Sequence, residues 1–521
     1  MELQKQPLNQ IVRKGKAFTQ ITVDDDCIVR DSKPDIVKMI HTKGRVVIDE
    51  VKVENRALWV SGQLKFMVLY RSDSEGSKLD TLSDAVSFRE KIYMDEILED
   101  DRVWVDQRVE DLNITAINSR KLAVRAVIGL EAVCEKPVTA EIACAVKGEE
   151  GILEKREKRT LLDLCVSKKD IMRTHAEFTL PGANPNIARI VYDNAEIRGL
   201  QTACMGDEIQ VRGTACVSVL YQSTEGGMEW FETETPFMGN IDAGREAGQQ
   251  SLYWIRVKPG ETELNLMTDA DQEPRNLSLD VNFDVELRMW QEKEYEILSD
   301  VYSLKNHLIP QTDDLCVWNL MVKNEAKQRL LQQMKLQEGQ EKILQVSSCE
   351  GKLEIDRVEI GENALDVEGI LLVDILYTTT DDHFPVAHTL EQLPFRQRIE
   401  VQGLSENEKD VIYELELGID QLAVNLLDSE QYEVKALISL TALVLREEHF
   451  DSISEISSEA MDIRELSELP GITGYVVQKG ESLWDIAKRY HTTEEEMMRT
   501  NGIPAGPLTP GQKLVIVKKV G

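Results

Sequence analysis

The chain contains the stretch Val60-Ser-Gly62-Gln-Leu-Lys-Phe-Met-Val-Leu69-Tyr70 and returns to its pattern twice. The second copy runs from Val211 to Tyr221 and the third from Val367 to Tyr377, and each reads Val-x-Gly, six residues, Leu-Tyr. The copies lie 151 and 156 residues apart. A long, nearly constant offset of this kind predicts tandem copies of one domain.

Other features recur at the same offsets. Phe-x-x-x-Ile follows each tyrosine, at Phe88, Phe237 and Phe395. Lys33-Pro34-Asp-Ile36 lies 151 residues before Asn184-Pro185-Asn-Ile187, and the third copy has Glu341 where the proline would fall. Asp-Leu-Cys-Val begins at both Asp163 and Asp314. We therefore predict three homologous units, at residues 1–160, 161–311 and 312–450.

Each unit is expected to be mainly β. Apolar residues alternate along 122–130, 279–287 and 434–440, the period of a half-buried strand. We predict three tandem antiparallel β-sandwich-like repeats, with a short helix near Pro34, near Pro185 and at the matching place of the third unit. Residues 323–337 are predicted to form a further helix between the second and third units. The glycine of Val-x-Gly fits a place where a side chain would clash or a bulge is needed.

The repeat ends in an acidic, serine-rich segment. Residues 451–472 are predicted to form a flexible linker, because such a composition buries too little apolar surface to fold. The remaining head, residues 473–521, would then move relative to the body.

The head has its own pattern. Tyr475 and Val477 alternate before a first helix, and Leu514 and Ile516 alternate after a second. Helix starts are written as Ser482 followed by Asp485 and as Thr493 followed by Glu496, both capping-box spacings. Leu483, Ile486, Ala487 and Tyr490 then form one apolar helix stripe. The expected order is strand, helix, helix, strand.

This head resembles the LysM domain through Lys479–Ala487, Asn501 and Pro510-Gly511-Gln512-x-Leu514, with Glu481 in place of the usual Asp. LysM domains commonly bind glycans that contain N-acetylglucosamine, between two loops. By resemblance, the residues that would contact a ligand or partner are Gly480, Glu481, Ser482, Leu483, Trp484, Asn501, Gly502, Ile503 and Leu508. The structural reading is that Leu483, Ile486, Ala487 and Leu514 are core residues and that Asn501 fixes the second loop.

Composition narrows the functional classes. The formal net charge of −33 argues against nucleic acid and anionic membranes as partners, because both need a Lys/Arg excess. The head carries seven Lys/Arg and five Asp/Glu, a net charge of +2, which leaves −35 on the first 472 residues. The first seven residues lack the apolar core of a signal peptide, and no run of 18 apolar residues predicts a membrane span. The eight scattered cysteines indicate reduced thiols in a cytosolic protein.

We expect no catalytic residues, metal site or cofactor. His383 and His388 have a spacing typical of a surface loop, and Asp269-x-Asp271-x-Glu273 lacks the glycine and distal glutamate of a calcium loop and reads as a hairpin turn. Phosphate-loop, dinucleotide and nucleophile-elbow motifs are absent from the sequence. The residues that recur between the units are of the kind that holds a fold, and the three tyrosines are expected to be half-buried strand residues.

Three β units, an acidic linker and a terminal LysM together resemble the SipL-type spore coat morphogenetic proteins. The resemblance implies a non-enzymatic scaffold in the mother-cell cytoplasm, which recruits or tethers a coat basement-layer ATPase at the forespore surface through its LysM domain. Because that compartment holds no polymeric peptidoglycan, the LysM domain would bind protein there. The alternative is a cell-wall protein that binds peptidoglycan or N-acetylglucosamine.

Overall fold

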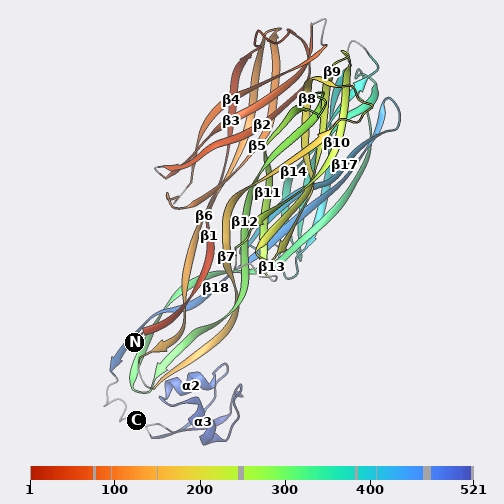
Figure 1. Ribbon diagram of the computed structural model, residues 1–521. Helices are drawn as coiled ribbons and strands as arrows, with labels where there is room; N and C mark the ends of the chain where they lie inside the picture. Colours follow the sequence, from red (N-terminus) through yellow and green to blue (C-terminus); the bar gives the residue numbers. More distant parts are fainter. Residues whose placement is uncertain are drawn as a thin grey trace.

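The computed structural model describes residues 2–54, 56–73, 78–94, 97–148, 151–244, 251–381, 385–406, 408–460 and 471–517. Figure 1 shows a long body of strands with a small helical head at one end. The predicted fold class is confirmed: three tandem antiparallel β repeats are followed by a small βααβ domain. Among the described residues, helices occur in the head and every other regular element is a strand.

Each unit contains six strands. Unit 1 has β1 (Glu2–Ile28), β2 (Ile36–Glu54), β3 (Ala57–Ser72), β4 (Leu79–Tyr93), β5 (Arg102–Asn118) and β6 (Lys121–Lys147). Unit 2 has β7 (Ile152–Thr179), β8 (Ile187–Met205), β9 (Glu208–Ser223), β10 (Met228–Asp242), β11 (Leu252–Thr268) and β12 (Pro274–Ser303). Unit 3 has β13 (Asn306–Lys335), β14 (Ile343–Gly361), β15 (Ala364–Thr379), β16 (Val386–Glu400), β17 (Val411–Leu426) and β18 (Gln431–Ala460).

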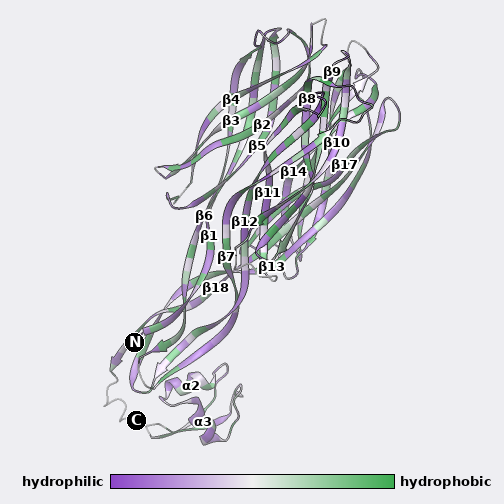
Figure 2. Cartoon of the chain, in the orientation of Figure 1, coloured by the Kyte–Doolittle hydropathy of each residue, from purple (hydrophilic) through white to green (hydrophobic). Residues whose placement is uncertain are grey.

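The three units share one topology. In unit 1 the sheets have the orders β2-β3-β4 and β1-β6-β5, and the corresponding strands of units 2 and 3 pair in the same way. In every unit the strand that carries Val-x-Gly is the central strand of the sheet with the shorter strands, called the smaller sheet below; these central strands are β3, β9 and β15. Polar and apolar residues alternate along these strands (Figure 2), so that each sheet turns one apolar face inward.

The repeated glycine makes room for the repeated phenylalanine. Gly213 lies directly opposite Phe237 in the β9–β10 register, and Gly369 lies opposite Phe395. A Cβ atom on either glycine would lie 2.7 Å from the Cζ atom of the facing ring. The expected steric reason for Val-x-Gly is therefore confirmed, and it explains why the glycine and the aromatic ring recur together.

The repeated tyrosine is bound to the repeated proline. The hydroxyl of Tyr70 donates to the carbonyl oxygen of Pro34 over 3.1 Å, and that of Tyr221 donates to Pro185 over 3.2 Å. Tyr377, whose unit lacks the proline, has a buried hydroxyl with no partner among the described residues. All three tyrosines are fully buried, so the expectation that they are half-buried was wrong.

The units close into a ring with approximate threefold symmetry. The last strand of each smaller sheet meets the first strand of the next sheet, since β4 contacts β8, β10 contacts β14, and β16 contacts β2. The motif leucines Leu69, Leu220 and Leu376 lie in one buried apolar cluster where the three sheets meet. The strand most repeated in the sequence is thus the strand that builds the centre of the ring.

The long antiparallel pairs formed by the first and last strand of each unit, β1/β6, β7/β12 and β13/β18, continue beyond the sandwiches and converge into a stalk (Figure 1). A register shift bulges Lys14, Cys165 and Met321 out of the three ladders, at equivalent positions of the repeat. On the stalk side of these bulges the strand pairs share buried clusters, one of which joins Leu8 and Ile142 of unit 1 to Tyr295 of unit 2 and Val317 of unit 3.

Several local predictions need correction. The helix predicted at 323–337 was wrong: residues 323–335 belong to strand β13, because pairing with β18 overrides the helix propensity of their Lys, Gln and Leu residues. The short helices predicted near Pro34, near Pro185 and at the matching place of unit 3, near Glu341, were also wrong, because turns and irregular backbone occupy all three places. Strands β7 and β13 run through the expected unit boundaries at 160 and 311. The expected linker overlaps β18 as far as Ala460, and its residues 461–470 lie outside the described part of the chain.

Candidate functional site: a groove in the terminal domain

The head folds as predicted from its caps. It contains β19 (Ile472–Val476), α2 (Leu483–Arg489), α3 (Glu494–Asn501) and β20 (Lys513–Val517), with β19 paired antiparallel to β20. The backbone N–H of Asp485 donates to Ser482 Oγ over 3.2 Å, and the N–H of Ser482 donates to Asp485 Oδ2 over 3.0 Å. Thr493 caps α3 by accepting from the N–H of Glu496. A full capping box therefore starts α2, whereas the N-cap hydrogen bond of Thr493 alone starts α3.

A groove separates the two loops of the head. Its described lining residues all belong to the head: Gly480, Glu481, Ser482, Leu483, Glu494, Met498, Ala505, Gly506, Pro507 and Leu508. The turn before α2 and the loop before β20 form the two walls, and α3 contributes Glu494 and Met498. The structure thus brings together five of the residues predicted as contacts, Gly480 to Leu483 and Leu508. The sequence analysis did not single out Glu494, Met498 and residues 505–507.

One wall of the groove carries a fixed negative charge. The carboxylate of Glu481 accepts hydrogen bonds from the N–H of Gln478 (2.9 Å), the hydroxyl of Tyr475 (2.7 Å) and the guanidinium of Arg489 (2.9 Å). The bond from Gln478, followed by that from Tyr475, lowers the pKa of Glu481. Gly480 beside it adopts a φ of 89°, which a side chain would strain. The groove therefore presents an ionised carboxylate held by three donors.

Four of the predicted contact residues lie elsewhere. The side-chain amide of Asn501 donates to the carbonyl oxygens of Met497 and Val515 and accepts from the N–H of Val515, so it ties α3 to β20 as the structural reading expected. Gly502 is the left-handed C-cap of α3, and Ile503 packs against the core of the head. Trp484 is buried against the stalk.

The head docks on the end of unit 2. The indole N–H of Trp484 donates to Asp300 Oδ2 over 2.8 Å, and the ammonium of Lys488 lies 2.6 Å from Asp300 Oδ1. The ring of Tyr302 meets that of Trp484 edge to face, with centroids 4.8 Å apart, and its hydroxyl donates to the carbonyl oxygen of Thr492. These contacts hold the head against β12, so the structure contradicts the expectation of a head that moves on a linker.

The contacts of Asp300 with the head lower the pKa of its carboxylate. Burial raises the pKa of Asp300, but the hydrogen bonds from Lys488 and Trp484 outweigh burial, and the pKa of Asp300 lies below its usual range. No motif in the sequence marks Asp300 or Tyr302, because the contact joins residues 184 positions apart.

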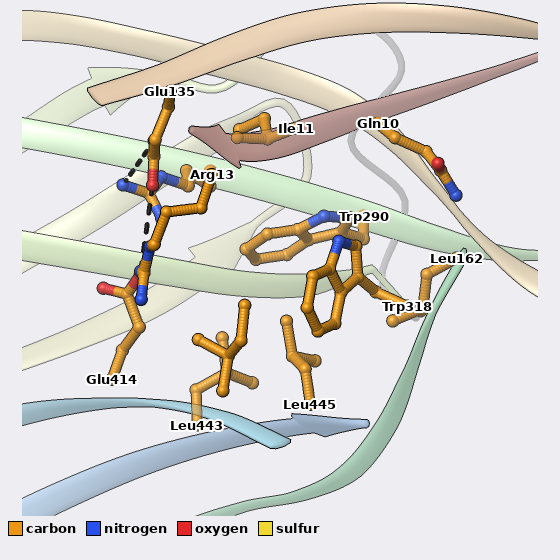
Figure 3. Close-up of a pocket in the computed structure, with 12 residues that line it drawn as sticks. Gln10, Ile11, Arg13, Glu135, Leu162, Trp290, Trp318, Glu414, Leu443 and Leu445 are labelled. Atoms are coloured by element: carbon orange, nitrogen blue, oxygen red, sulfur yellow. Dashed lines mark hydrogen bonds and ion pairs between the residues drawn. The ribbon is translucent and has the colours of Figure 1, made fainter. Parts of the chain in front are cut away.

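A second cavity lies inside the body, where the three units meet (Figure 3). Arg13 stands between Glu135 and Glu414, and Arg288 contacts the same two carboxylates over 3.1 and 2.8 Å. The indoles of Trp290 and Trp318 lie beside these charges (Figure 3). Every charged side chain of this cavity has an opposite charge from another unit, so we interpret the cavity as a lock between units.

The motifs that the sequence analysis considered for metal binding or thiol chemistry can now be placed in the described residues. Asp269 Oδ1 accepts from the N–H groups of Asp271 and Glu273, which is the predicted hairpin turn. The eight cysteines are all free, and burial is the largest cause that raises the pKa of Cys27 to about 12 and of Cys134 to about 11. His383 lies outside the described residues, whereas His388 belongs to strand β16 and faces Asp374 of β15, so the surface loop expected for it was wrong.

Comparison with known families matches these two parts of the structure. The LysM domain model matches residues 475–517, and the model described as SipL, SPOCS domain matches residues 35–117 and 342–427. The chain thus matches a SipL-type protein with a LysM domain. The two SPOCS matches span β2–β5 and β14–β17, and the corresponding strands β8–β11 of unit 2 have the same topology. No curated protein and no solved structure matches the chain.

The matched families consist of binding and scaffold domains. A LysM domain is consistent with recognition of a peptidoglycan-type glycan. In the described part of the chain, no helix is long and apolar enough to cross a membrane.

Proposed function

We propose that the chain is a non-enzymatic scaffold of spore coat assembly, acting in the mother-cell cytoplasm at the forespore surface. Its LysM groove recruits or tethers the coat basement-layer ATPase. The combination of SPOCS units with a LysM domain supports a role in sporulation. The other support is architectural, because a ring of three β units with a stalk is suited to holding a binding head.

The observation that carries the proposal is the way the head is held. Docking uses Trp484, Lys488 and Thr492, none of which lines the groove. Gly480 and residues 505–507 remain exposed at its walls. A head that is held by one face and open at another presents its groove in a fixed direction, as a tether between two structures requires.

The experiment blocks the groove in sporulating cells that carry the full chain. Ala505→Trp adds a large side chain to an exposed wall residue, and Thr500→Trp adds the same side chain to an exposed position of α3 outside the groove. We expect detachment of a fluorescent coat protein from the forespore in the first strain and normal attachment in the second. A normal coat in the Ala505→Trp strain would contradict recruitment through the groove.

The alternative function is binding of peptidoglycan or another glycan that contains N-acetylglucosamine. It is favoured by the position of the groove, which lies between the two loops that the LysM resemblance assigns to ligand. Sedimentation of the full chain with purified sacculi tests it. Loss of sedimentation in the Ala505→Trp variant would favour this alternative, whereas a wild-type chain that stays in solution would count against it.

A further inference from the structure

Three side chains with metal-binding atoms meet between units 1 and 3. His41 comes from β2, Asp374 from β15 and His388 from β16. His41 Nε2 lies 2.8 Å from Asp374 Oδ2, and His388 Nε2 lies 3.0 Å from Asp374 Oδ1. One ligand atom from each residue lies within 4.8 Å of the others. Both imidazoles thus present the same nitrogen to one carboxylate.

The set occurs at one of the three junctions of the ring. Strand registers identify the equivalent positions, because each faces the motif leucine of its unit. His41 corresponds to Tyr192 and Ser348, which pair with Leu220 and Leu376. His388 corresponds to Thr81 and Trp230, and Asp374, two residues before its motif leucine, corresponds to Met67 and Ser218. Packing of the repeat therefore does not require these three donors.

The surroundings favour a cation. His41 is 3% exposed, while the side chains of Asp374 and His388 are partly exposed and leave a way in. The ring of Tyr192 closes one side of His41, at a centroid distance of 5.9 Å. The charged groups around this ring are Asp374, Glu350 and Asp193, and the ammonium of Lys43 lies 2.5 Å from Glu350. Lys43 thus pairs with one of these three carboxylates, which leaves a local excess of negative charge near the site.

We propose that His41, Asp374 and His388 bind one divalent transition-metal ion, with zinc as the fitting member of the class. Imidazole nitrogen and carboxylate oxygen are ligands that zinc accepts at about 2.0–2.2 Å, and three protein ligands leave a fourth position for water. Binding requires both imidazoles to be neutral with the proton on Nδ1, so that each Nε2 is free to bind the metal and gives up its contact with Asp374. The Nδ1 atom of His41 has no partner among the described residues.

The site would close the ring. Units 1 and 3 are the two that no direct chain connection joins, and the ligands come from these two units alone. A metal ion would therefore replace a weak polar contact by a coordinate link at the open junction. Because binding to the folded state stabilises it by mass action, zinc should raise the melting temperature of the chain.

The test uses the untagged full chain, freed of metal with a chelator and titrated with zinc against a chromophoric indicator. The variant is His388→Ala, chosen because His388 is the more exposed imidazole. The matched control is His449→Ala, which removes a histidine from another group of potential metal ligands in the body, formed by His449, Cys316 and Glu447. Circular dichroism confirms that both variants remain folded.

We expect one zinc ion per chain in the wild type and in His449→Ala. In His388→Ala the affinity should fall by at least about 100-fold, more than the usual loss of an outer-shell partner. The zinc-dependent rise in melting temperature should disappear in that variant alone. Zinc held equally by His388→Ala, as thiol binding would produce, overturns the proposal, and so does a wild type with no stoichiometric zinc.

Discussion

The contact between head and stalk can be broken from the stalk side with one substitution, Asp300→Ala. This change removes the acceptor of Trp484 and Lys488 without touching a residue of the head. Tyr302 stays in place and keeps its ring contact with Trp484. The substitution therefore weakens docking while it leaves the groove and the fold of the head unchanged.

The magnitude follows from the two bonds. A hydrogen bond to a charged group contributes about 1.5–3 kcal/mol, and Trp484 is buried where it donates to Asp300. The ion pair with Lys488 is partly exposed, since the lysine side chain is 37% accessible, so it adds about 0.2–1 kcal/mol. Together these predict a loss of roughly 2–4 kcal/mol, a shift of about 30-fold or more in the docking equilibrium.

The assay is small-angle X-ray scattering of the full chain, with Asp271→Ala as a control at an exposed turn of the same unit. The radius of gyration should rise in Asp300→Ala and stay constant in the control. Because the pKa of Asp300 is depressed in the folded state, its contribution is complete above the usual aspartate pKa of about 4 and is lost as the pH falls through the depressed value. Wild-type scattering should thus stay constant from about pH 5 to 8. Identical scattering of Asp300→Ala and wild type would refute this account of docking.

Three further predictions concern the body. Tyr70→Phe should destabilise unit 1 by about 0.5–1.5 kcal/mol, whereas Tyr377→Phe, which removes a hydroxyl with no described partner, should be neutral or stabilising. Urea unfolding, followed by hydrogen exchange in each unit, compares the two variants. An equal loss of stability in both variants would contradict this prediction. Gly369→Ala should cost about 1–3 kcal/mol in the same assay, because its Cβ would meet the Phe395 ring and a backbone oxygen. Burial lowers the pKa of Lys323 to about 8, so an amine-reactive reagent should modify it well below the pH at which ordinary lysines react, and mass spectrometry that finds no selectivity at pH 8 would count against this.

The repeat could be predicted from sequence because its signals are local. Alternation of apolar residues predicts the strands, and the glycine of Val-x-Gly predicts a close neighbour. The structure shows that this neighbour is Phe237 in unit 2 and Phe395 in unit 3. Residues 323–335 show the limit of local reasoning, because their strand state depends on pairing with residues of β18 that lie 96 to 120 positions further along the chain. The ring itself left no local signal, since its junctions join different units.

The functional site likewise has residues that could be predicted from sequence and residues that could not. Each loop of the groove is a continuous stretch of sequence, and the resemblance to LysM domains pointed to Gly480 to Leu483 and Leu508, which line the groove. The role of Trp484 in docking could not, because its partner Asp300 belongs to another domain. The cluster of His41 and Asp374 spans 333 residues and becomes visible when the ring is closed.

The most direct test of the proposed function is a parallel capture experiment with the full chain and its Ala505→Trp variant. Each is used as bait in a lysate of sporulating cells and mixed separately with purified sacculi. The scaffold account predicts that the wild type retains a coat ATPase, that the groove variant loses it, and that neither sediments with sacculi. Sacculus binding by the wild type with no retained ATPase would contradict the account and assign the groove to glycan.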